Sequence, residues 1–194
     1  MAASLAIPGQ AEAKDEVGLL LGGSVIPNST PNLKIGSTLA YQATYAHRFF
    51  DNPAFGFAFE VPFVALPSQA VHSTIPTVPQ NFASLFLTPG FRVTLAPKRT
   101  IAPWASVGGG YSRFAESSLL ENGTPNIFKK GTNKGALQYG GGVDFKAPFH
   151  LPLPLLFRGE IRDFYSGQPR LNIVRSGPGQ HNIFISGGFV LRFP

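Results

Sequence analysis

The sequence contains no cysteine, which excludes disulfide bonds and thiolate metal sites. Charged side chains are also scarce. They make up 13% of the 194 residues, whereas a soluble globular domain has about 25%. Hydrophobic residues make up 43% of the chain. A large part of the protein surface is therefore expected to face something other than water.

Long uninterrupted apolar runs are absent as well. The longest stretch without a charged residue, 61–91, is interrupted by five prolines. A membrane-spanning helix needs about 20 mostly apolar residues, and an interior proline breaks a helix. The sequence therefore predicts no transmembrane helix, and Glu, Lys and Ala do not recur at helical spacing anywhere in it.

Phenylalanine, glycine and proline are abundant instead. The chain has 18 Phe, 22 Gly and 18 Pro, but one Met and one Trp. Aromatic residues favour strands, while Gly and Pro mark turns and strand ends. This composition predicts one all-β domain. The net charge is +6, and no run of Lys or Arg exceeds two residues, which fits contact with anionic lipid headgroups and gives no basic patch for nucleic acid.

The first 13 residues differ from the rest of the chain. They are small and mildly apolar and end in Ala11-Glu12-Ala13, a pattern that signal peptidases cleave. We interpret residues 1–13 as a signal-peptide remnant or a disordered leader, and residues 14–194 as the folded domain.

Alternation with a period of two recurs along the chain. It is clearest in 54–66, where one set of alternate positions is large and apolar and the other is small or polar. The first set is Phe55, Phe57, Phe59, Val61 and Phe63, and the second is Gly56, Ala58, Glu60 and Pro62. Successive side chains of a strand point to opposite faces, so this segment is a strand between two different environments.

Similar patterns predict eight strands of mostly ten to fifteen residues. They lie at 17–26, 33–49, 54–66, 82–95, 101–114, 137–146, 155–165 and 182–193. The facing of 101–114 stays open, because a bulge at Gly108-Gly109-Gly110 would switch its two faces. Leu33 and Ile35 are expected to share a face with Leu39 and Tyr41.

The predicted connections alternate between short and long. The short ones are 51–53, 96–99 and 148–154, and the long ones are 26–32, 67–81, 116–133 and 166–180. In an antiparallel meander all the short turns then meet at one end and all the long loops at the other, as in transmembrane barrels. An even number of strands places both termini at the short-turn end.

Alternation fits two kinds of barrel, a soluble one with an apolar interior around a ligand and a membrane barrel with an apolar exterior. The number of large aromatic side chains favours the second, because the lumen of eight strands is just wide enough for side chains to fill. We therefore predict an eight-stranded antiparallel up-and-down transmembrane β-barrel. Aromatic residues are expected at its two membrane interfaces, namely Tyr41, Tyr45, Trp104, Tyr139 and Phe193.

The charged residues of the polar faces are expected to meet in the lumen. They are Arg48, Glu60, Arg92, Asp144, Lys146, Arg158, Glu160 and Arg162. Charges removed from bulk water must pair or stay hydrated. The favoured interpretation is a salt-bridge network that plugs the barrel; the alternative is a narrow path or gate for ions built from the same residues.

Three segments resemble a known family. They are Ala102-Pro103-Trp104 leading to Val107-Gly108-Gly109-Gly110-Tyr111, the strand Arg158–Tyr165, and the closing strand with Phe189-Val190-Leu191-Arg192-Phe193. Over residues 17–194 the chain resembles the bacterial outer-membrane β-barrel proteins of the OmpA/OmpX/OmpW-like small-barrel superfamily.

The resemblance implies a location in the bacterial outer membrane with both termini in the periplasm. It implies contact with outer-membrane lipid and lipopolysaccharide, and no cofactor. It also implies recognition of the closing strand by the barrel assembly machinery through its final aromatic residue. That residue is Phe193 here, and Pro194 departs from the family pattern by following it.

The expected function is a structural or surface-interaction role with long extracellular loops and no catalysis. A narrow channel for ions or small solutes is one alternative. A lipid-modifying barrel enzyme is another. The run Asp163-Phe164-Tyr165-Ser166-Gly167 resembles the lipid A deacylase strand, but Phe164 occupies the position of that family's histidine, and a serine without a base is a poor nucleophile. A soluble ligand-binding barrel is the last alternative.

Overall fold

The computed structural model describes residues 14–27, 32–147, 155–173 and 179–193, and it is all-β. The strands of this described part are β1 Asp15–Val25, β2 Leu33–Ile35, β3 Leu39–Asp51, β4 Phe55–Ser73, β5 Asn81–Leu87, β6 Gly90–Leu95, β7 Ile101–Glu116, β8 Gly131–Lys146, β9 Leu155–Ser166 and β10 Ile183–Phe193. Within these ranges no helix is long and apolar enough to cross a membrane. The predicted leader 1–13 and the predicted turn 148–154 lie outside the described residues.

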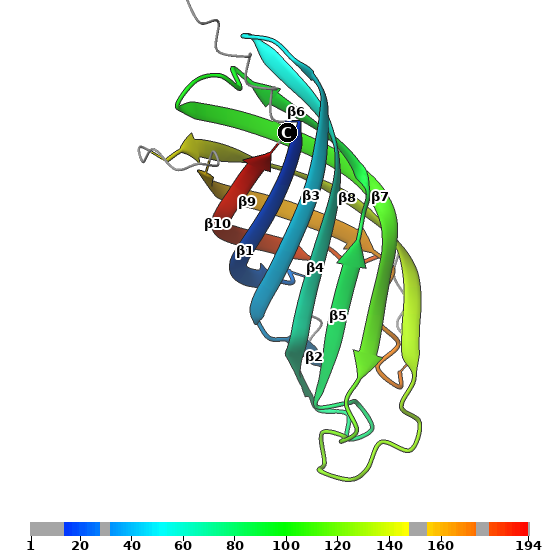
Figure 1. Ribbon diagram of the computed structural model, residues 1–194. Helices are drawn as coiled ribbons and strands as arrows, with labels where there is room; N and C mark the ends of the chain where they lie inside the picture. Colours follow the sequence, from blue (N-terminus) through cyan, green and yellow to red (C-terminus); the bar gives the residue numbers. More distant parts are fainter. Residues whose placement is uncertain (1–13, 28–31, 148–154, 174–178, 194) are drawn as a thin grey trace, which may run out of the picture.

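The wall of the molecule is a closed ring of eight antiparallel strands, as the sequence predicted. β1 pairs with β3 on one side and with β10 on the other, so the first and last strands close the ring. From β3 the ring continues through β4 to β7, β8, β9 and β10, with β5 and β6 together filling one strand position between β4 and β7. Figure 1 shows β10 beside β1.

The fourth wall strand is divided into β5 and β6 at Thr88-Pro89. Proline has no amide hydrogen for the ladder and interrupts it. Glycines of β7 let the chain pass close to this break, because a Cβ on Gly110 would lie 2.2 Å from the carbonyl oxygen of Leu87. β7 itself pairs with β8 from Ile101 to Ala115 without a register shift. β7 therefore keeps one alternation throughout, and no bulge at Gly108-Gly109-Gly110 switches its two faces.

One sequence prediction was wrong about the segment 33–49. The structure divides it into β2 and β3, and β2 leaves the ring to pair with the far end of β4. Leu33 and Ile35 are buried, whereas Leu39 and Tyr41 are about half exposed on the outer wall. Residues 36–38 between the two strands lie in neither strand, and there the chain changes the face it presents.

The two ends of the barrel differ. One end, here named the short-turn end, carries the tight connections 52–54 and 96–100, and there Asp15 pairs with Phe193. The other, the long-loop end, carries the connections 74–80 and 117–130 and the described parts of the connections from β1 to β3 and from β9 to β10. In Figure 1 the yellow-green loop after β7 extends from this end. The second long connection is shorter than the predicted 67–81, because β4 continues to Ser73.

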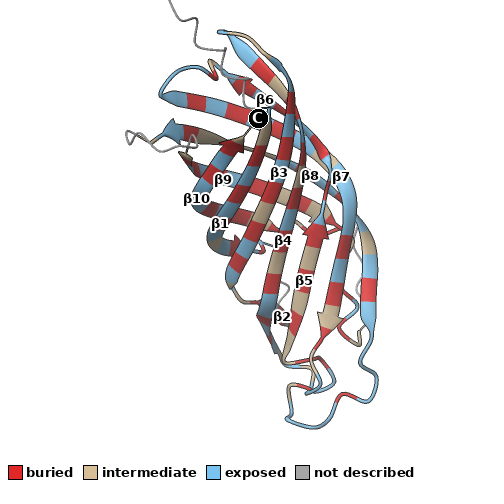
Figure 2. Ribbon diagram, viewed as in Figure 1, coloured by how far each residue is buried: buried red, intermediate tan, exposed pale blue. Residues whose placement is uncertain are grey.

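Exposure alternates along most of each wall strand, which Figure 2 shows as alternating colours, and on β4 the alternation shifts by one residue at 67–68, where the pairing with β5 is irregular. On β4, Phe55 and Phe59 point outward and are 44% and 38% exposed, while Ala58 and Glu60 point inward and are buried. The outer wall is therefore apolar and the interior holds the charges. This is the arrangement of a transmembrane barrel and the reverse of a soluble one.

Candidate functional site

The lumen near the short-turn end holds a group of charged side chains, all buried except the partly exposed Asp51, here named the ionic cluster. Its members are Glu16, Arg48, Asp51, Glu60, Arg92, Asp144, Arg158, Glu160, Arg162 and Arg192. Five guanidinium groups thus meet five carboxylates. Most of them lie within a few residues of the short-turn end of their strands, so the inward positions of neighbouring strands bring them to one level of the barrel.

Glu16 on β1 is the centre of the cluster. Its two carboxylate oxygens accept hydrogen bonds from the guanidinium groups of Arg48 and Arg92, from Nε of Arg192 at 2.8 Å and from Nη2 of Arg158 at 3.5 Å. These four arginines come from β3, β6, β10 and β9. A single carboxylate 2% exposed therefore links strands from around the ring.

Asp144 forms the second centre and also binds the only tryptophan. Arg158 donates from Nε and Nη2 to the two Asp144 oxygens at 2.7 and 2.8 Å. Nε1 of Trp104 donates to Oδ1 of Asp144 at 3.1 Å. The guanidinium carbons of Arg162, Arg158 and Arg92 lie 4.8, 5.1 and 5.8 Å from the Trp104 ring centroid, within the range of cation–π attraction.

Trp104 was therefore wrongly predicted as a membrane-interface residue. Its side chain is 5% exposed and lies inside the lumen. The ring offers an apolar surface on which the arginines stack, and its N–H uses a carboxylate that would otherwise have a free lone pair. The inward position follows from the alternation of β7, in which Trp104 shares a face with Ser106 and Phe114.

Asp51 pairs with Arg48 at 2.5 Å, and Arg162 joins the other two carboxylates, Glu60 and Glu160, nearer the middle of the barrel. Its Nη1 lies 2.6 Å from Oε1 of Glu60, and its Nε lies 2.8 Å from Oε1 of Glu160. Nε2 of Gln42 donates to the same Glu160 oxygen at 2.6 Å. Nη1 of Arg162 also donates to Oγ of Ser106 at 3.3 Å. Buried charges cost less when their partners are further hydrogen-bonded, as Arg162 and Glu160 are here.

Seven of the eight charges that the sequence placed in the lumen lie in the ionic cluster. Lys146 does not. It is exposed at the end of β8, where its Nζ donates to the carbonyl oxygen of Lys98 at 2.5 Å. Sequence reasoning missed Glu16 because the first strand was predicted to begin at residue 17. It missed Arg192 although that residue occupied a polar alternate position of the predicted closing strand.

Above the ionic cluster, toward the long-loop end, the lumen holds a cluster of apolar side chains beside buried polar ones such as Ser84, Ser112 and Asn182. This apolar cap is a cluster of buried side chains: Ile26, Leu33, Ile35, Ala40, Val64, Leu66, Val71, Val78, Phe82, Phe86, Phe114, Ala136, Phe164, Leu171 and Phe184. Phe86 is its centre, with ring centroids 5.1 Å from Phe164, 5.7 Å from Phe184 and 5.9 Å from Phe114. The cap was not predicted, because the inward phenylalanines interrupt otherwise polar faces.

The other predicted interface aromatics lie on the outer wall. Tyr41, Tyr45 and Tyr139 are each between 43% and 49% exposed. The hydroxyl of Tyr45 donates to Asp15 at 2.8 Å, and that of Tyr139 donates to Asp163 at 2.6 Å. Phe193 is partly exposed beside Asp15 at the short-turn end. These positions suit an interfacial role, which stays a prediction.

Within the part of the chain that the structure describes, the side chains needed for a serine hydrolase are not brought together at Ser166. Its hydroxyl is buried and points into the lumen, where it donates to the carbonyl of Gly167 and accepts from Asn182. The one histidine close by, His181, pairs with Asp163 at 2.6 Å and its side chain is 42% exposed. Among the described residues, no group of three or more His, Asp or Glu side chains is placed to hold a metal ion.

Several solved structures have the same architecture. The crystal structure of Neisserial surface protein A has a TM-score of 0.58 at 12% identity, covering 92% of this chain and 97% of that one. Ail, the attachment invasion locus protein of Yersinia pestis, has 0.50 at 13% identity, covering 93% and 99%. The outer membrane protein OprG from Pseudomonas aeruginosa has 0.50 at 13% identity, covering 95% and 98%.

No protein-family model matches the chain, and no curated protein sequence matches it. The relationship is therefore visible in the fold and not in the sequence identity. The closed ring of eight strands, the apolar outer wall and these structural matches agree. The chain has the fold of the small outer-membrane β-barrel proteins.

Proposed function

We propose that this chain is a small bacterial outer-membrane protein with a sealed lumen, acting through its outer surface and long loops in a structural or surface-interaction role. The observation that carries the proposal is the double closure of the lumen. Paired charged side chains are buried in the half near the short-turn end, and a cluster of phenylalanine rings is buried across the half near the long-loop end.

The apolar cap argues against the alternative of a narrow channel. If the whole lumen were polar, ions could follow a hydrated path along the arginine side chains. An ion leaving the ionic cluster toward the long loops would have to pass Phe82, Phe86, Phe114, Phe164 and Phe184, which are all at most 1% exposed. An ion without water or polar partners in such surroundings costs many kcal/mol.

The orientation that fits this role puts the long loops outside the cell and the short turns in the periplasm, as is usual for outer-membrane barrels. The described ends of the chain, which pair at the short-turn end, would then be periplasmic. The closing strand β10, with Phe193 at its end, would be the segment read by the assembly machinery. The attachment and invasion protein among the structural matches supports a surface-interaction role for such a barrel.

Conductance across a planar lipid bilayer tests the proposal. The refolded protein should give no conductance steps, while its insertion is verified by a mobility shift between unboiled and boiled samples on a gel. A porin added to the same bilayer serves as the positive control. Regular steps from the wild-type protein would contradict the sealed lumen and establish the channel. No mobility shift, with good solubility in the absence of detergent, would contradict the membrane barrel itself.

A further inference from the structure

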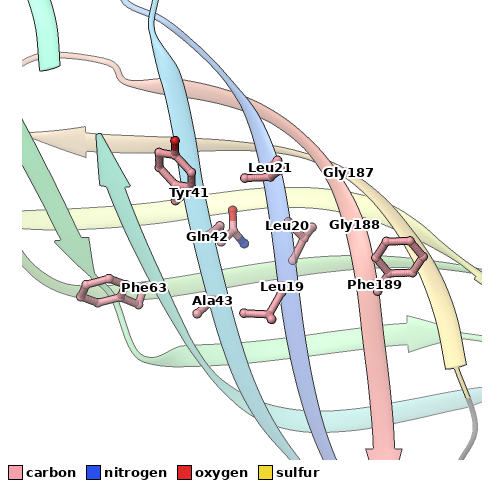
Figure 3. A pocket seen from close by; sticks show the side chains of 10 residues that line it. All are labelled: Leu19, Leu20, Leu21, Tyr41, Gln42, Ala43, Phe63, Gly187, Gly188 and Phe189. Carbon is pink, nitrogen blue, oxygen red and sulfur yellow. The ribbon is translucent and has the colours of Figure 1, made fainter. Parts of the chain in front are cut away.

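The outer wall carries an apolar recess of about 500 Å³ across strands β10, β1, β3 and β4. Figure 3 shows its lining, with Phe63 on one side, Phe189 on the other and the residues of β1 and β3 between them. A volume of this size is within the range of about 300–1,000 Å³ found for small-molecule sites. Most of the wall around it is formed by large side chains, so the recess needs a local cause.

The cause is a pair of small outward residues placed among large ones. Ala43 lies in register between Phe63 of β4 and Leu19 of β1. Gly187 lies in register between Leu21 of β1 and Gly159 of β9. At both points the outer surface therefore drops to the level of the backbone. On neighbouring positions Leu19, Leu21 and Phe189 are more than half exposed and stand out from the wall.

The lining residues of the recess favour a hydrocarbon ligand. None of the ten lining residues is charged, and Gln42, one of the two with a polar side chain, turns its amide into the lumen toward Glu160. The other is Tyr41, whose hydroxyl makes no hydrogen bond with any residue that the structure describes. It lies at the edge of the recess nearest the long-loop end, since β3 runs from that end to the short turns.

We propose that this recess holds one acyl chain of a lipid from the leaflet on the long-loop side, with the Tyr41 hydroxyl donating a hydrogen bond to an oxygen of the lipid's acyl linkage. This inference rests on the proposed membrane location. A flexible chain fills an irregular apolar groove, and a hydroxyl at the groove's end suits the polar end of that chain. The result is a resident lipid on one side of the barrel.

A second copy of the barrel fits the recess less well. Closed dimers use the same patch on both subunits. A two-fold contact centred here would place one recess against the other and leave both unfilled. An unfilled apolar space lacks the van der Waals contacts that drive the association of proteins within a lipid bilayer. An acyl chain needs no such complementary surface.

Photo-crosslinking in vesicles tests the proposal with the wild-type chain. The probe is a phosphatidylcholine with a diazirine on its acyl chain, added to dilauroyl phosphatidylcholine vesicles that contain the refolded protein. Crosslinks should be enriched several-fold on 19–21, 41–43 and 187–189 over 101–107 of β7. That reference segment has exposed apolar side chains and lies on the other side of the ring. Uniform labelling of both segments would overturn the proposal.

Two variants that fill the recess make the test specific. Ala43→Phe should reduce labelling around the recess to the level of β7, whereas Ala105→Phe, the same change at an outward alanine of β7, should leave it unaltered. Gly187→Leu should act like Ala43→Phe, and its added Cβ meets no atom closer than 3.6 Å, so it is expected to fold. Unchanged labelling in both filled variants would contradict the proposal.

Two further readouts separate this proposal from the others. Protein–protein crosslinks that form at the recess and disappear in Ala43→Phe would assign the surface to a second copy and overturn the lipid site. A wild-type protein that shows no heat-dependent mobility shift and does not insert into vesicles would refute the proposed membrane location instead.

Discussion

The carboxylate of Glu16 and the guanidinium of Arg92 are 76 positions apart in the chain and form an ion pair inside the barrel. β1 and β6, which carry them, are not neighbours in the wall, so the pair spans the lumen. Arg48, Arg158 and Arg192 reach the same carboxylate from three other strands. The side chain of Glu16 therefore connects strands from around the closed sheet.

Replacing Glu16 by Gln should lower the free energy of unfolding by about 3–5 kcal/mol, because loss of one partner leaves buried guanidinium charges uncompensated. Gln keeps the shape of the side chain, so the loss reports on charge. Urea unfolding of the protein folded in lipid vesicles measures it. The neighbouring change Asp15→Asn is the control. Asp15 pairs with His47 on the outer wall, and exposed pairs contribute about 1 kcal/mol or less. Equal losses for the two variants would contradict the central role of Glu16.

Trp104 offers a spectroscopic test of the lumen, because it is the only tryptophan of the chain. Its fluorescence should be nearly insensitive to lipids with brominated acyl chains, since the wall and the ionic cluster separate the ring from hydrocarbon. A variant with Trp104→Phe and Val107→Trp moves the indole to the outer face of the same strand and should be strongly quenched. Strong quenching of the wild-type protein would place Trp104 outside and refute the observed facing of β7.

The period-two alternation predicted most of the ring of strands, because most of each strand separates two environments. It also placed most of the buried charges, since Arg158, Glu160 and Arg162 occupy consecutive inward positions of one strand. Alternation shows which residues share a face but not where along the barrel axis they lie. Lys146 has inward spacing, but it is exposed because it lies at the end of the wall.

Other errors arose where local sequence gave no signal for a tertiary contact. Trp104 was assigned to the interface because tryptophan is common there, whereas its arginine partners come from strands β6 and β9. The inward position of Phe86 is understandable only once Phe164 and Phe184, about 80 to 100 positions later, surround it. The apolar cap is therefore a property of the closed barrel and not of any one strand.

The depth of each outward position should determine the cost of a charge there. Val107 lies in the middle of β7 and is 62% exposed, while Ile101 begins that strand at the short-turn end. Val107→Arg should destabilise the folded barrel by about 2–4 kcal/mol and Ile101→Arg by about 0–1 kcal/mol, because the cost falls from the bilayer midplane to the interface. Urea unfolding in vesicles gives both values. Equal costs at the two positions would show that β7 does not cross the bilayer as proposed.

The closure between β1 and β10 can be tested by a disulfide, because the chain has no cysteine of its own. Val17 and Leu191 are directly opposed across this seam. Directly opposed Cα atoms in antiparallel strands are about 4.5 or 5.5 Å apart, and both distances suit a disulfide. The double variant Val17→Cys, Leu191→Cys should therefore oxidise readily after folding. The crosslinked chain should run differently from the reduced chain on a gel after boiling.

The matched control moves one cysteine two residues along β10. Val17→Cys with Phe189→Cys places the thiols on the same face, but about 7–8 Å separates the Cα atoms of such diagonal pairs. This pair should oxidise much more slowly. In an open sheet the first and last strands would be distant edges, and neither pair would form. Equal oxidation of both pairs would show that β1 and β10 can shift in register against each other. Oxidation of the Val17 and Leu191 pair alone requires a closed barrel in which Asp15 is paired with Phe193.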